Sequence, residues 1–402
     1  MSSHAPRAET AWPSVSYEQL PWVSRYERGE ASRAQLRLHQ GPYAAGIPAQ
    51  IARTRLVLPT AVAAAVEDAA TEIARFDEQA GAVVAPFVRL LLRSEAAASS
   101  QIENLTASAR AIAQAELLGG SGSANAAQIV SNSTAMTAAV ALASDLSERS
   151  ILAMNHTLLH NHDSDSAGKW RDQQVWIGGS RLGPHRAQFV PPQHARISAA
   201  INDLVKFMAR DDLPVLAHAA LAHAQFETIH PFSDGNGRTG RALIHAMIHG
   251  KGLVRHITVP LSAGLLVNVD AYFAALTAYR EGDVEPIIAQ LADAAFVGIS
   301  NGRRLVANLQ DIRESWADRI RARQNSHSWR IAELVFTHPV LNAELIASSL
   351  GLSPSNVYGP LKPLLDAGVL IESGGRTRGR IWRSDEVLKA LDLFSARAGR
   401  RR

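Results

Sequence analysis

The spacing of apolar residues predicts that most of the chain is helical. Within residues 59–118, Val62, Ala65, Val66 and Ala69 recur at the i, i+3, i+4, i+7 spacing of a helix with one buried face. The pattern shows no internal repeat. Similar periodicity predicts further helices, which extend up to about residue 162 and then occupy 197–208, 214–229 and 238–307.

One segment has the pattern of strands instead. Val175–Ile177 and Gln188–Val190 are short apolar runs, and the glycines between them are typical of a turn. Pro191 and Pro192 end the second run, because proline cannot donate a backbone hydrogen bond to a sheet. We therefore predict a β-hairpin over residues 174–192 within an otherwise helical body.

The last hundred residues predict a separate small domain. Asn342–Leu350, followed by Gly351 and by a helix that Ser353 caps, has the spacing of a helix–turn–helix. Pro363 is expected to kink or shorten the second helix. A small hairpin predicted over 369–382 would form a wing, so this part of the chain is expected to be a winged helix–turn–helix.

Composition excludes several classes of protein. The length of 402 residues is enough for two or three domains. The chain contains no cysteine, which excludes disulfides, thiolate metal sites and cysteine nucleophiles. The amino terminus lacks the layout of a signal peptide, and the uncharged stretch at 117–144 is too rich in Gly, Ser, Asn and Thr to span a membrane. We expect a cytoplasmic protein with no membrane partner.

The positive charge is concentrated at the carboxy terminus. The last thirty residues contain nine Lys/Arg and three Asp/Glu, a local charge of +6, which leaves about −2 for the rest of a chain whose net charge is +4. Arg376, Arg378, Arg380 and Arg383 on the predicted wing would contact DNA phosphates. Lys362 is the only cation of the presumed recognition helix, so docking onto a target or a second copy is an equal alternative.

The chemistry is concentrated in residues 230–241, whose sequence is His-Pro-Phe-Ser-Asp-Gly-Asn-Gly-Arg-Thr-Gly-Arg. A helix is expected to end near His230, because Pro231 disfavours helical geometry in the residue before it. The Asp-Gly-Asn-Gly run predicts a tight turn, and a new helix is expected near Arg238. The free N–H groups at the start of that helix form an anion site, and the two glycines of the turn let a phosphate approach the backbone closely.

Side chains of the same run complete a phosphate site. Arg238 and Arg241, three residues apart, project on neighbouring helix faces and can bind phosphate oxygens. Asp234 offers a hard oxygen ligand for Mg²⁺. His230 has the side chain best suited to general base catalysis at neutral pH. A glycine turn between helices explains any one of these residues, but not the whole run.

Residues 230–241 resemble the signature of the Fic family (the Fic/Doc superfamily), His-Pro-Phe-x-[Asp/Glu]-Gly-Asn-Gly-Arg-x-x-Arg, and every fixed position is matched. Phe226–Ile229 and the predicted hairpin also resemble family members. The resemblance implies an all-α fold, namely a Fic-type helical bundle with a short β-hairpin flap plus a winged helix–turn–helix domain. The implied segments are an amino-terminal Fic-associated region with an inhibitory helix at 1–115, a Fic catalytic core at 116–302, a helical linker at 303–327 and the winged domain at 328–402.

Members of this family mostly transfer AMP from ATP to a hydroxyl of a target protein. By this resemblance His230 would deprotonate a Tyr, Thr or Ser hydroxyl, and Asp234 would hold Mg²⁺ at the α- and β-phosphates. Self-modification and a homodimer are left open. The implied phosphate contacts are Gly235, Asn236 and Gly237, including the Asn236 side chain, for the α-phosphate, and Arg238 and Arg241 for the β- and γ-phosphates.

A second motif lies upstream of the first. Residues 99–104 resemble the family's inhibitory pattern, [Ser/Thr]-x-x-x-Glu-[Gly/Asn], with Ser99 and Glu103 on one helix face and Asn104 in the last position. In the family such a glutamate pairs with the second arginine of the signature, here Arg241, and blocks productive placement of the γ-phosphate. The resemblance implies a self-restrained enzyme, whereas a solvated helix face is the alternative.

Two further sets of residues are singled out by position. Val175, Trp176 and Ile177 would pair with the target segment by strand addition, although the buried alternation of a hairpin explains them equally well. Asn268 and Tyr272 lie where family members often contact adenine, although Tyr272 is equally typical of a core residue.

Three functional hypotheses remain. The first is a Mg²⁺-dependent protein adenylyltransferase restrained by Glu103. In the second, the same site removes AMP, with Glu103 orienting water, or transfers another phosphate-bearing group. The third is a DNA-binding regulator whose Fic-like part senses nucleotide, against which His230 argues because a sensor needs no base. A zinc site at His156 and His160 is disfavoured, since the Glu of a His-Glu-x-x-His site is missing.

Overall fold

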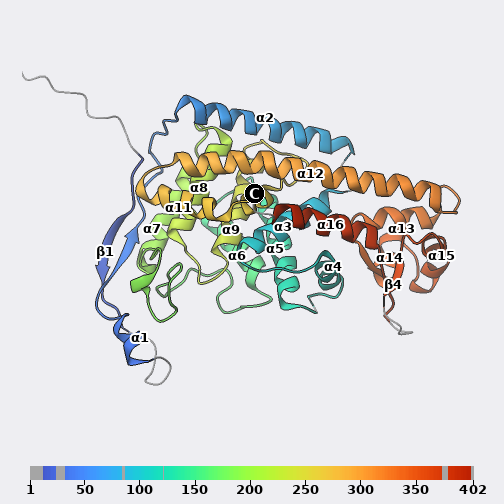
Figure 1. Ribbon diagram of the computed structural model, residues 1–402, viewed down its shortest axis with the longest axis horizontal. Helices are drawn as coiled ribbons and strands as arrows, with labels where there is room; N and C mark the ends of the chain where they lie inside the picture. The colour runs from blue at the N-terminus through green and yellow to red at the C-terminus, as the bar shows by residue number, and fades with distance from the viewer. Residues whose placement is uncertain (1–11, 24–31, 84–86, 121, 374–378, 400–402) are drawn as a thin grey trace, which may run out of the picture. The chain divides into compact units, whose positions relative to one another are not determined.

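The computed structural model describes residues 12–23, 32–83, 87–120, 122–373 and 379–399. The described residues are mostly helical and carry two small antiparallel sheets (Figure 1), which confirms the predicted all-α class. They form two compact units built from discontinuous segments, and the division into four consecutive segments stays a prediction. The first unit comprises 1–70, 138–251 and 270–292, and the second comprises 71–137, 252–269 and 293–402.

The first unit is organised around a buried helix, α8 (Val215–Ile229). Every residue of α8 after the first is buried, and five of them are alanines, whose small side chains let neighbouring helices approach closely. Helices α7 and α9 pack against it, and α6 packs against α9. The unit contains β1 (Ser16–Leu20), α1 (Arg33–Arg37), β2 (Tyr43–Ile47), α6 (Glu148–Leu159), the short 3₁₀ turns η2 (Pro184–Arg186) and η3 (His194–Arg196), α7 (Ile197–Met208), α8, α9 (Asn236–Gly250) and nearly all of α11 (Val269–Glu281).

The predicted hairpin at 174–192 is only partly formed. Its two runs meet at one isolated antiparallel bridge, Ile177 with Phe189, rather than along a ladder. Gly178 and Gly179 have φ angles of 73° and 75°, so the extended run ends directly after Ile177. The second run continues into the β1–β2 sheet instead, because the N–H of Gly46 donates to the carbonyl of Val190 at 2.8 Å. We call residues 174–192 the flap below.

The second unit contains the remaining helices and a three-stranded antiparallel sheet of order β3-β5-β4. Helix α16 packs on α3, α4 and α10. Two long helices, α2 (Thr60–Val83) and α12 (Glu285–Arg319), contribute to both units. The other elements are α3 (Val88–Ile102), α4 (Ala109–Leu117), most of α5 (Ala124–Ala141), α10 (Leu261–Leu266), α13 (His327–Val335), β3 (Val340–Asn342), α14 (Ala343–Leu350), the 3₁₀ turn η4 (Pro354–Val357), α15 (Tyr358–Asp366), β4 (Ile371–Ser373), β5 (Ile381–Arg383) and α16 (Asp385–Ala398).

The first residues of the expected helical linker lie in α12, which runs without interruption for 35 residues, and the linker itself stays a prediction. One expectation about the carboxy-terminal part needs correction. The helix expected to begin at a Ser353 cap is split into η4 and the nine-residue α15, and Ser353 makes no capping hydrogen bond. Pro363 lies inside α15, which continues past it to Asp366, so a shortening by this proline stays a prediction. The winged-helix class stays a prediction, and Arg376 and Arg378 lie outside the described residues.

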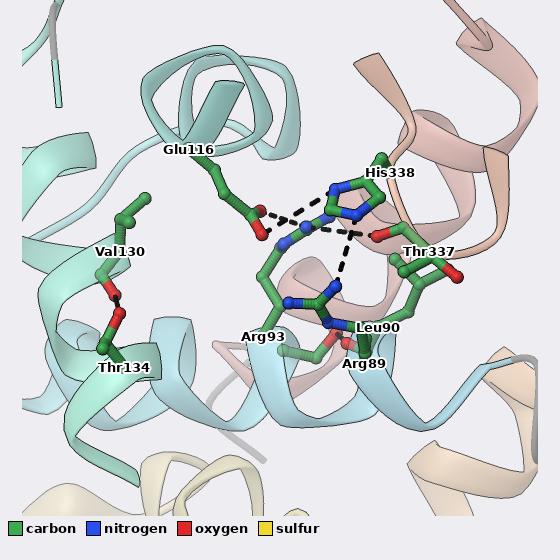
Figure 2. A network of polar contacts seen from close by, with 9 residues as sticks. Arg89, Leu90, Arg93, Glu116, Val130, Thr134, Thr337 and His338 are labelled. Carbon is green, nitrogen blue, oxygen red and sulfur yellow. Dashed lines mark hydrogen bonds and ion pairs between the residues drawn. The ribbon is translucent and has the colours of Figure 1, made fainter. Parts of the chain in front are cut away.

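A polar network joins α3 to the segment that follows α13 (Figure 2). Arg93 of α3 pairs with Glu116 and contacts the carbonyl of Thr337, while Arg89 lies 3.2 Å from His338 Nε2. The Arg93 side chain is only 7% exposed. Burial lowers the pKa of Arg93, and the neighbouring Glu116 opposes that effect. Glu116 therefore compensates a charge that would otherwise be buried alone.

Replacement of Glu116 by alanine is expected to destabilise the second unit by about 3 kcal/mol, because it leaves the buried guanidinium unpaired. Urea unfolding followed by near-ultraviolet circular dichroism measures the change. Glu333→Ala is the matched control, since its ion pair with Arg313 is about half exposed on both sides and should contribute less than about 1 kcal/mol. Equal effects of the two variants would contradict the assignment of Arg93 as a buried charge.

Within the described residues, no helix has both the length and the apolar character needed to cross a membrane.

Candidate active site

His230 lies at the carboxy-terminal end of α8 in an unusual backbone conformation. Its φ and ψ angles are 48° and 61°, in the left-handed region that side chains other than glycine rarely adopt. The N–H of His230 still donates to the carbonyl of Phe226 at 2.8 Å, and Pro231 prevents the helix from continuing. The side chain is 21% exposed. Strained backbone of this kind clusters at functional sites. The backbone geometry of His230 therefore supports the prediction that this residue has a functional role.

The loop after His230 is closed by the side chain of Asn236. The Asn236 amide accepts from the N–H of Phe232 and donates to its carbonyl, both at 2.9 Å. Phe232 is buried, with its ring 4.9 Å from that of Trp170. The amide therefore helps to fix the loop's shape, and the contact of the Asn236 side chain with an α-phosphate stays a prediction.

Gly235 starts the next helix, α9, from a left-handed conformation with a φ angle of 77°. A Cβ atom at this position would lie 2.8 Å from a methyl carbon of Leu158, so the close packing of α6 against the loop also requires glycine. The first N–H groups of an α-helix have no acceptor within the helix. The backbone of Asn236 and Gly237 thus begins α9 two residues before the expected start near Arg238, and its binding of a phosphate stays a prediction.

Asp234 and Arg238 lie together at this helix start. One carboxylate oxygen of Asp234 accepts from the N–H of Gly235 at 2.6 Å, and the other from Arg238 Nη2 at 3.2 Å. The Asp234 side chain is 62% exposed, whereas that of Arg238 is 3% exposed. A bound ion can therefore reach the carboxylate, while the guanidinium is held in place by its surroundings.

The fit of Mg²⁺ to this site follows from the kind of ligand that is present. The described residues contain no group of three or more His, Asp or Glu side chains that could enclose a metal ion. Mg²⁺ in nucleotide sites is typically held by one or two carboxylates together with the substrate's phosphates. One exposed carboxylate beside a helix start fits that mode of binding and does not fit a metal cage made by the protein alone.

Arg171 was not singled out from the sequence, yet it contacts both the loop of His230 and the flap. Its Nε donates to the carbonyl of His230 at 2.9 Å, and its backbone N–H donates to the carbonyl of Pro231 at 3.0 Å. Its Nη1 and Nη2 donate to the carbonyls of Gln173 and Pro192 at 2.8 and 2.6 Å. Burial lowers the pKa of Arg171 to about 10, so it remains charged at neutral pH. One guanidinium therefore bridges the candidate base and both ends of the flap.

The flap residues differ in what their backbones can offer. The N–H of Ile177 donates to Phe189 and its carbonyl accepts from Gln188, at 2.8 and 2.9 Å, so both groups are used inside the flap. Backbone groups of successive residues in an extended segment face opposite sides, which directs those of Trp176 away from residues 188–189. The Trp176 ring packs edge-on against Trp22, with centroids 5.5 Å apart. A role of Val175, Trp176 and Ile177 in holding a target segment stays a prediction.

The two predicted adenine contacts differ in burial. Tyr272 is 1% exposed, and its hydroxyl lies 2.7 Å from His223 Nε2 with the two rings stacked. This burial favours the alternative of a core residue, and the contact of Tyr272 with adenine stays a prediction. Asn268 is an exposed residue of the second unit, and its role stays a prediction.

The predicted inhibitory motif forms the end of α3 in the second unit. Ser99 is buried, while Glu103 is the exposed residue that caps the helix. The N–H of Leu105 donates to Ser100 and that of Asn104 to Gln101, both at 3.0 Å, which is the Schellman pattern of helix termination. Asn104 has a φ angle of 61°. The Gly/Asn choice at the last motif position thus has a backbone cause, since these residues tolerate the left-handed conformation best.

Three of the described basic side chains in the carboxy-terminal part are paired with acids. Lys362 bonds Asp366 at 2.7 Å, Arg383 bonds Asp385 at 2.6 Å, and Arg380 lies 3.3 Å from Glu372. These neighbours reduce the positive field that DNA phosphates would meet. DNA binding through this part stays a prediction with less support than the sequence alone suggested.

The comparisons with known proteins agree on one family. Residues 145–248 match the model of the Fic/DOC family, and residues 63–141 match the model described as Fic/DOC family N-terminal. The protein adenylyltransferase fic-1 of Caenorhabditis briggsae is 34% identical over 149 residues, which are 37% of this chain and 27% of that protein. The protein adenylyltransferase Fic of Aedes aegypti is 30% identical over 149 residues, covering 36% of this chain and 27% of that protein. The match thus spans about a quarter of the length of these curated relatives.

A solved structure supports the fold. The crystal structure of a Fic family protein from Desulfovibrio desulfuricans G20 aligns with a TM-score of 0.52, covering 82% of this chain and 97% of that chain at 21% identity. At this identity the likeness shows a shared fold and leaves the activity to the residues of the site.

Proposed function

This chain contains a domain of the Fic/DOC family, and we propose on that basis that it is a protein adenylyltransferase. It would transfer AMP from ATP to a Tyr, Thr or Ser hydroxyl of a target protein and release pyrophosphate. One observation carries the proposal: His230, a candidate base, lies on strained backbone directly before a helix start equipped with Asp234 and Arg238. The curated relatives in nematodes and insects are named protein adenylyltransferases.

Transfer of AMP requires the protein mainly to position the reacting groups and to neutralise the charge of the phosphates. In the proposed step the hydroxyl oxygen attacks the α-phosphorus, its proton passes to His230, and the bond from the α-phosphorus to the pyrophosphate oxygen breaks. The first N–H groups of α9 would orient the α-phosphate. Arg238 and Arg241 would bind the remaining phosphates. Mg²⁺ at Asp234 would supply charge neutralisation for the leaving pyrophosphate.

We further propose that Glu103 restrains the activity. The support is the complete inhibitory motif at residues 99–104 and a helix end that presents Glu103 on the surface. In the second candidate function the same glutamate would orient a water for removal of AMP. Both functions use His230, and the balance between them sets how much modified target accumulates.

Intact mass spectrometry after incubation with ATP and Mg²⁺ tests these proposals. The set is the wild type, Glu103→Gly, and Glu103→Gly combined with His230→Ala. We expect an AMP-sized gain in Glu103→Gly, a weak gain in the wild type and none in the double variant. Glycine is a suitable replacement because it leaves the left-handed turn at Asn104 intact while it removes the carboxylate.

If ATP binds but none of the three proteins gains the mass of AMP, the result would argue against adenylylation. The same purified proteins, incubated with a chemically adenylylated peptide, would then test AMP removal. Equal gains in the wild type and in Glu103→Gly would contradict the proposed restraint but leave the transfer activity standing.

A further inference from the structure

A buried carboxylate lies beside the candidate base. Glu227 stands three residues before His230 on α8, and its Oε2 atom lies 3.7 Å from His230 Nδ1. Only 6% of Glu227 is exposed. Within the described residues, Glu227 Oε1 and His230 Nδ1 are buried atoms that form no hydrogen bond. The contact is an ion-pair distance, and a rotation of the ring that shortened it by less than 1 Å would make a hydrogen bond.

The packing around Glu227 leaves room for a carboxylate. Gly240 of α9 faces it, and a Cβ atom there would lie 2.9 Å from Glu227 Oε1 and 3.0 Å from His223 Nδ1. Glycine at position 240 is the fifth residue of α9, where nothing in the helix itself requires glycine. The glycine is therefore explained by the space that the carboxylate and the His223 ring occupy between α8 and α9.

The groups that face Glu227 are cationic or can become so. His223 and His230 come from α8, Arg241 from α9 and Arg280 from α11. Burial by itself raises the pKa of this carboxyl, but His230, His223 and Arg241 outweigh burial and lower the pKa to about 2. Glu227 is thus an anion at neutral pH. Arg280 extends the arrangement toward the flap, because its guanidinium lies 4.0 Å from the centre of the Phe189 ring.

We propose that Glu227 is the positioning residue of His230. Its carboxylate accepts the Nδ1–H of the imidazole, which fixes the ring so that Nε2 carries the free lone pair and faces the substrate. When Nε2 takes the proton of the attacking hydroxyl, the carboxylate stabilises the imidazolium that forms. The arrangement follows the same logic as the acid of a catalytic triad, with the acid supplied one helical turn earlier. Its meaning for catalysis rests on the proposed function.

Nitrogen-15 labelled histidine makes the proposal testable without any enzymatic turnover. Long-range proton–nitrogen spectra report which ring nitrogen is protonated, and the His230 signals are identified by their loss in His230→Ala. We expect the Nδ1–H tautomer in the wild type. Glu227→Gln should shift His230 toward the other tautomer and move the midpoint of its titration to lower pH by roughly one unit or more, since a nearby anion favours the protonated ring.

Two variants keep the result interpretable. Glu227→Asp retains the charge that Arg241 and Arg280 require but withdraws it from His230, so a folded protein with an intermediate midpoint is expected. Asp203→Asn is the matched control for loss of a carboxylate. The carboxylate of Asp203 in α7 accepts a hydrogen bond from the N–H of Ile51 at 2.6 Å, and no contact of Asp203 with His230 is found within the described residues. A folded Glu227→Gln or Glu227→Asp whose His230 tautomer and midpoint match the wild type would overturn the proposal.

The pH dependence of AMP transfer gives a second measurement, made in the Glu103→Gly background. Glu227→Gln should lower the single-turnover rate by roughly tenfold or more and move the acidic limb of the profile to lower pH. A uniform fall of the rate at all pH values would indicate a structural role and would overturn the proposal. Absence of AMP transfer in every protein would count against the proposed function alone, because the spectra decide the role of Glu227 separately.

Discussion

Replacement of His230 by alanine is expected to lower the rate of AMP transfer by about 10²–10⁴-fold, the usual contribution of a general base. The substitution removes the only side chain that we assign to proton transfer. It should leave nucleotide binding nearly unchanged, because we propose that the phosphate contacts come from the α9 backbone and from Arg238 and Arg241. The left-handed backbone at residue 230 makes alanine slightly unfavourable there, as it does histidine.

The measurement is a single-turnover assay in the Glu103→Gly background, combined with calorimetric titration of ATP in the presence of Mg²⁺. His160→Ala is the matched control, since His160 is an exposed histidine at the end of α6. A His230→Ala protein that binds ATP normally and transfers AMP at the rate of the control would remove His230 from the mechanism.

Replacement of Gly264 by alanine is expected to destabilise the second unit by about 3 kcal/mol or more, the upper range for overpacking. A Cβ atom at Gly264 of α10 would lie 2.0 Å from the carbonyl oxygen of Ala294 and 2.6 Å from its Cα. The obstructing atoms are backbone atoms of α12, which cannot move aside as a flexible side chain can. The two helices would have to separate, and buried contacts along their length would be lost.

Thermal unfolding followed by circular dichroism checks this expectation. Gly359→Ala is the control, because Gly359 has no neighbouring heavy atom within 4 Å of a built Cβ and lies in helix α15 with an ordinary φ angle. That variant should be neutral or stabilised by up to about 1 kcal/mol, as alanine favours helices. Similar midpoints for the two variants would show that α10 and α12 have more freedom than their close approach indicates.

The sequence was sufficient for the mostly helical fold class and for the break between α8 and α9. Residues 230–241 carry local information in the order of Pro, Gly and Asn, so the break after α8 and the start of α9 were predictable. The Gly/Asn position of the inhibitory motif was recognised as a pattern, although its cause is visible only in the φ angle of Asn104. Local chemistry of this kind needs no knowledge of the distant chain.

Contacts between distant segments could not be predicted in the same way. The two hydrogen bonds of the Asn236 amide to Phe232 could not be foreseen, because they depend on how the short loop satisfies its own backbone. From the sequence, a tyrosine at position 272 suits an adenine contact and a core position equally well. Its burial and its bond to His223 are visible only in the structure. Arg171 belongs to no recognised sequence motif. Its role depends on four carbonyl groups, which only folding brings together around it.

The bridge made by Arg171 has a consequence for how such a protein can change its targets. Its guanidinium donates to the carbonyls of Gln173, which directly precedes the flap, and of Pro192, which ends it. It also donates to the carbonyl of His230, so the two ends of the flap are held at a fixed distance from the candidate base. The tip of the flap takes no part in these bonds. Under the proposed role of the flap in binding a target segment, changes within residues 180–187 would alter which segment is bound. Arg171 would keep the distance between the incoming hydroxyl and the base unchanged.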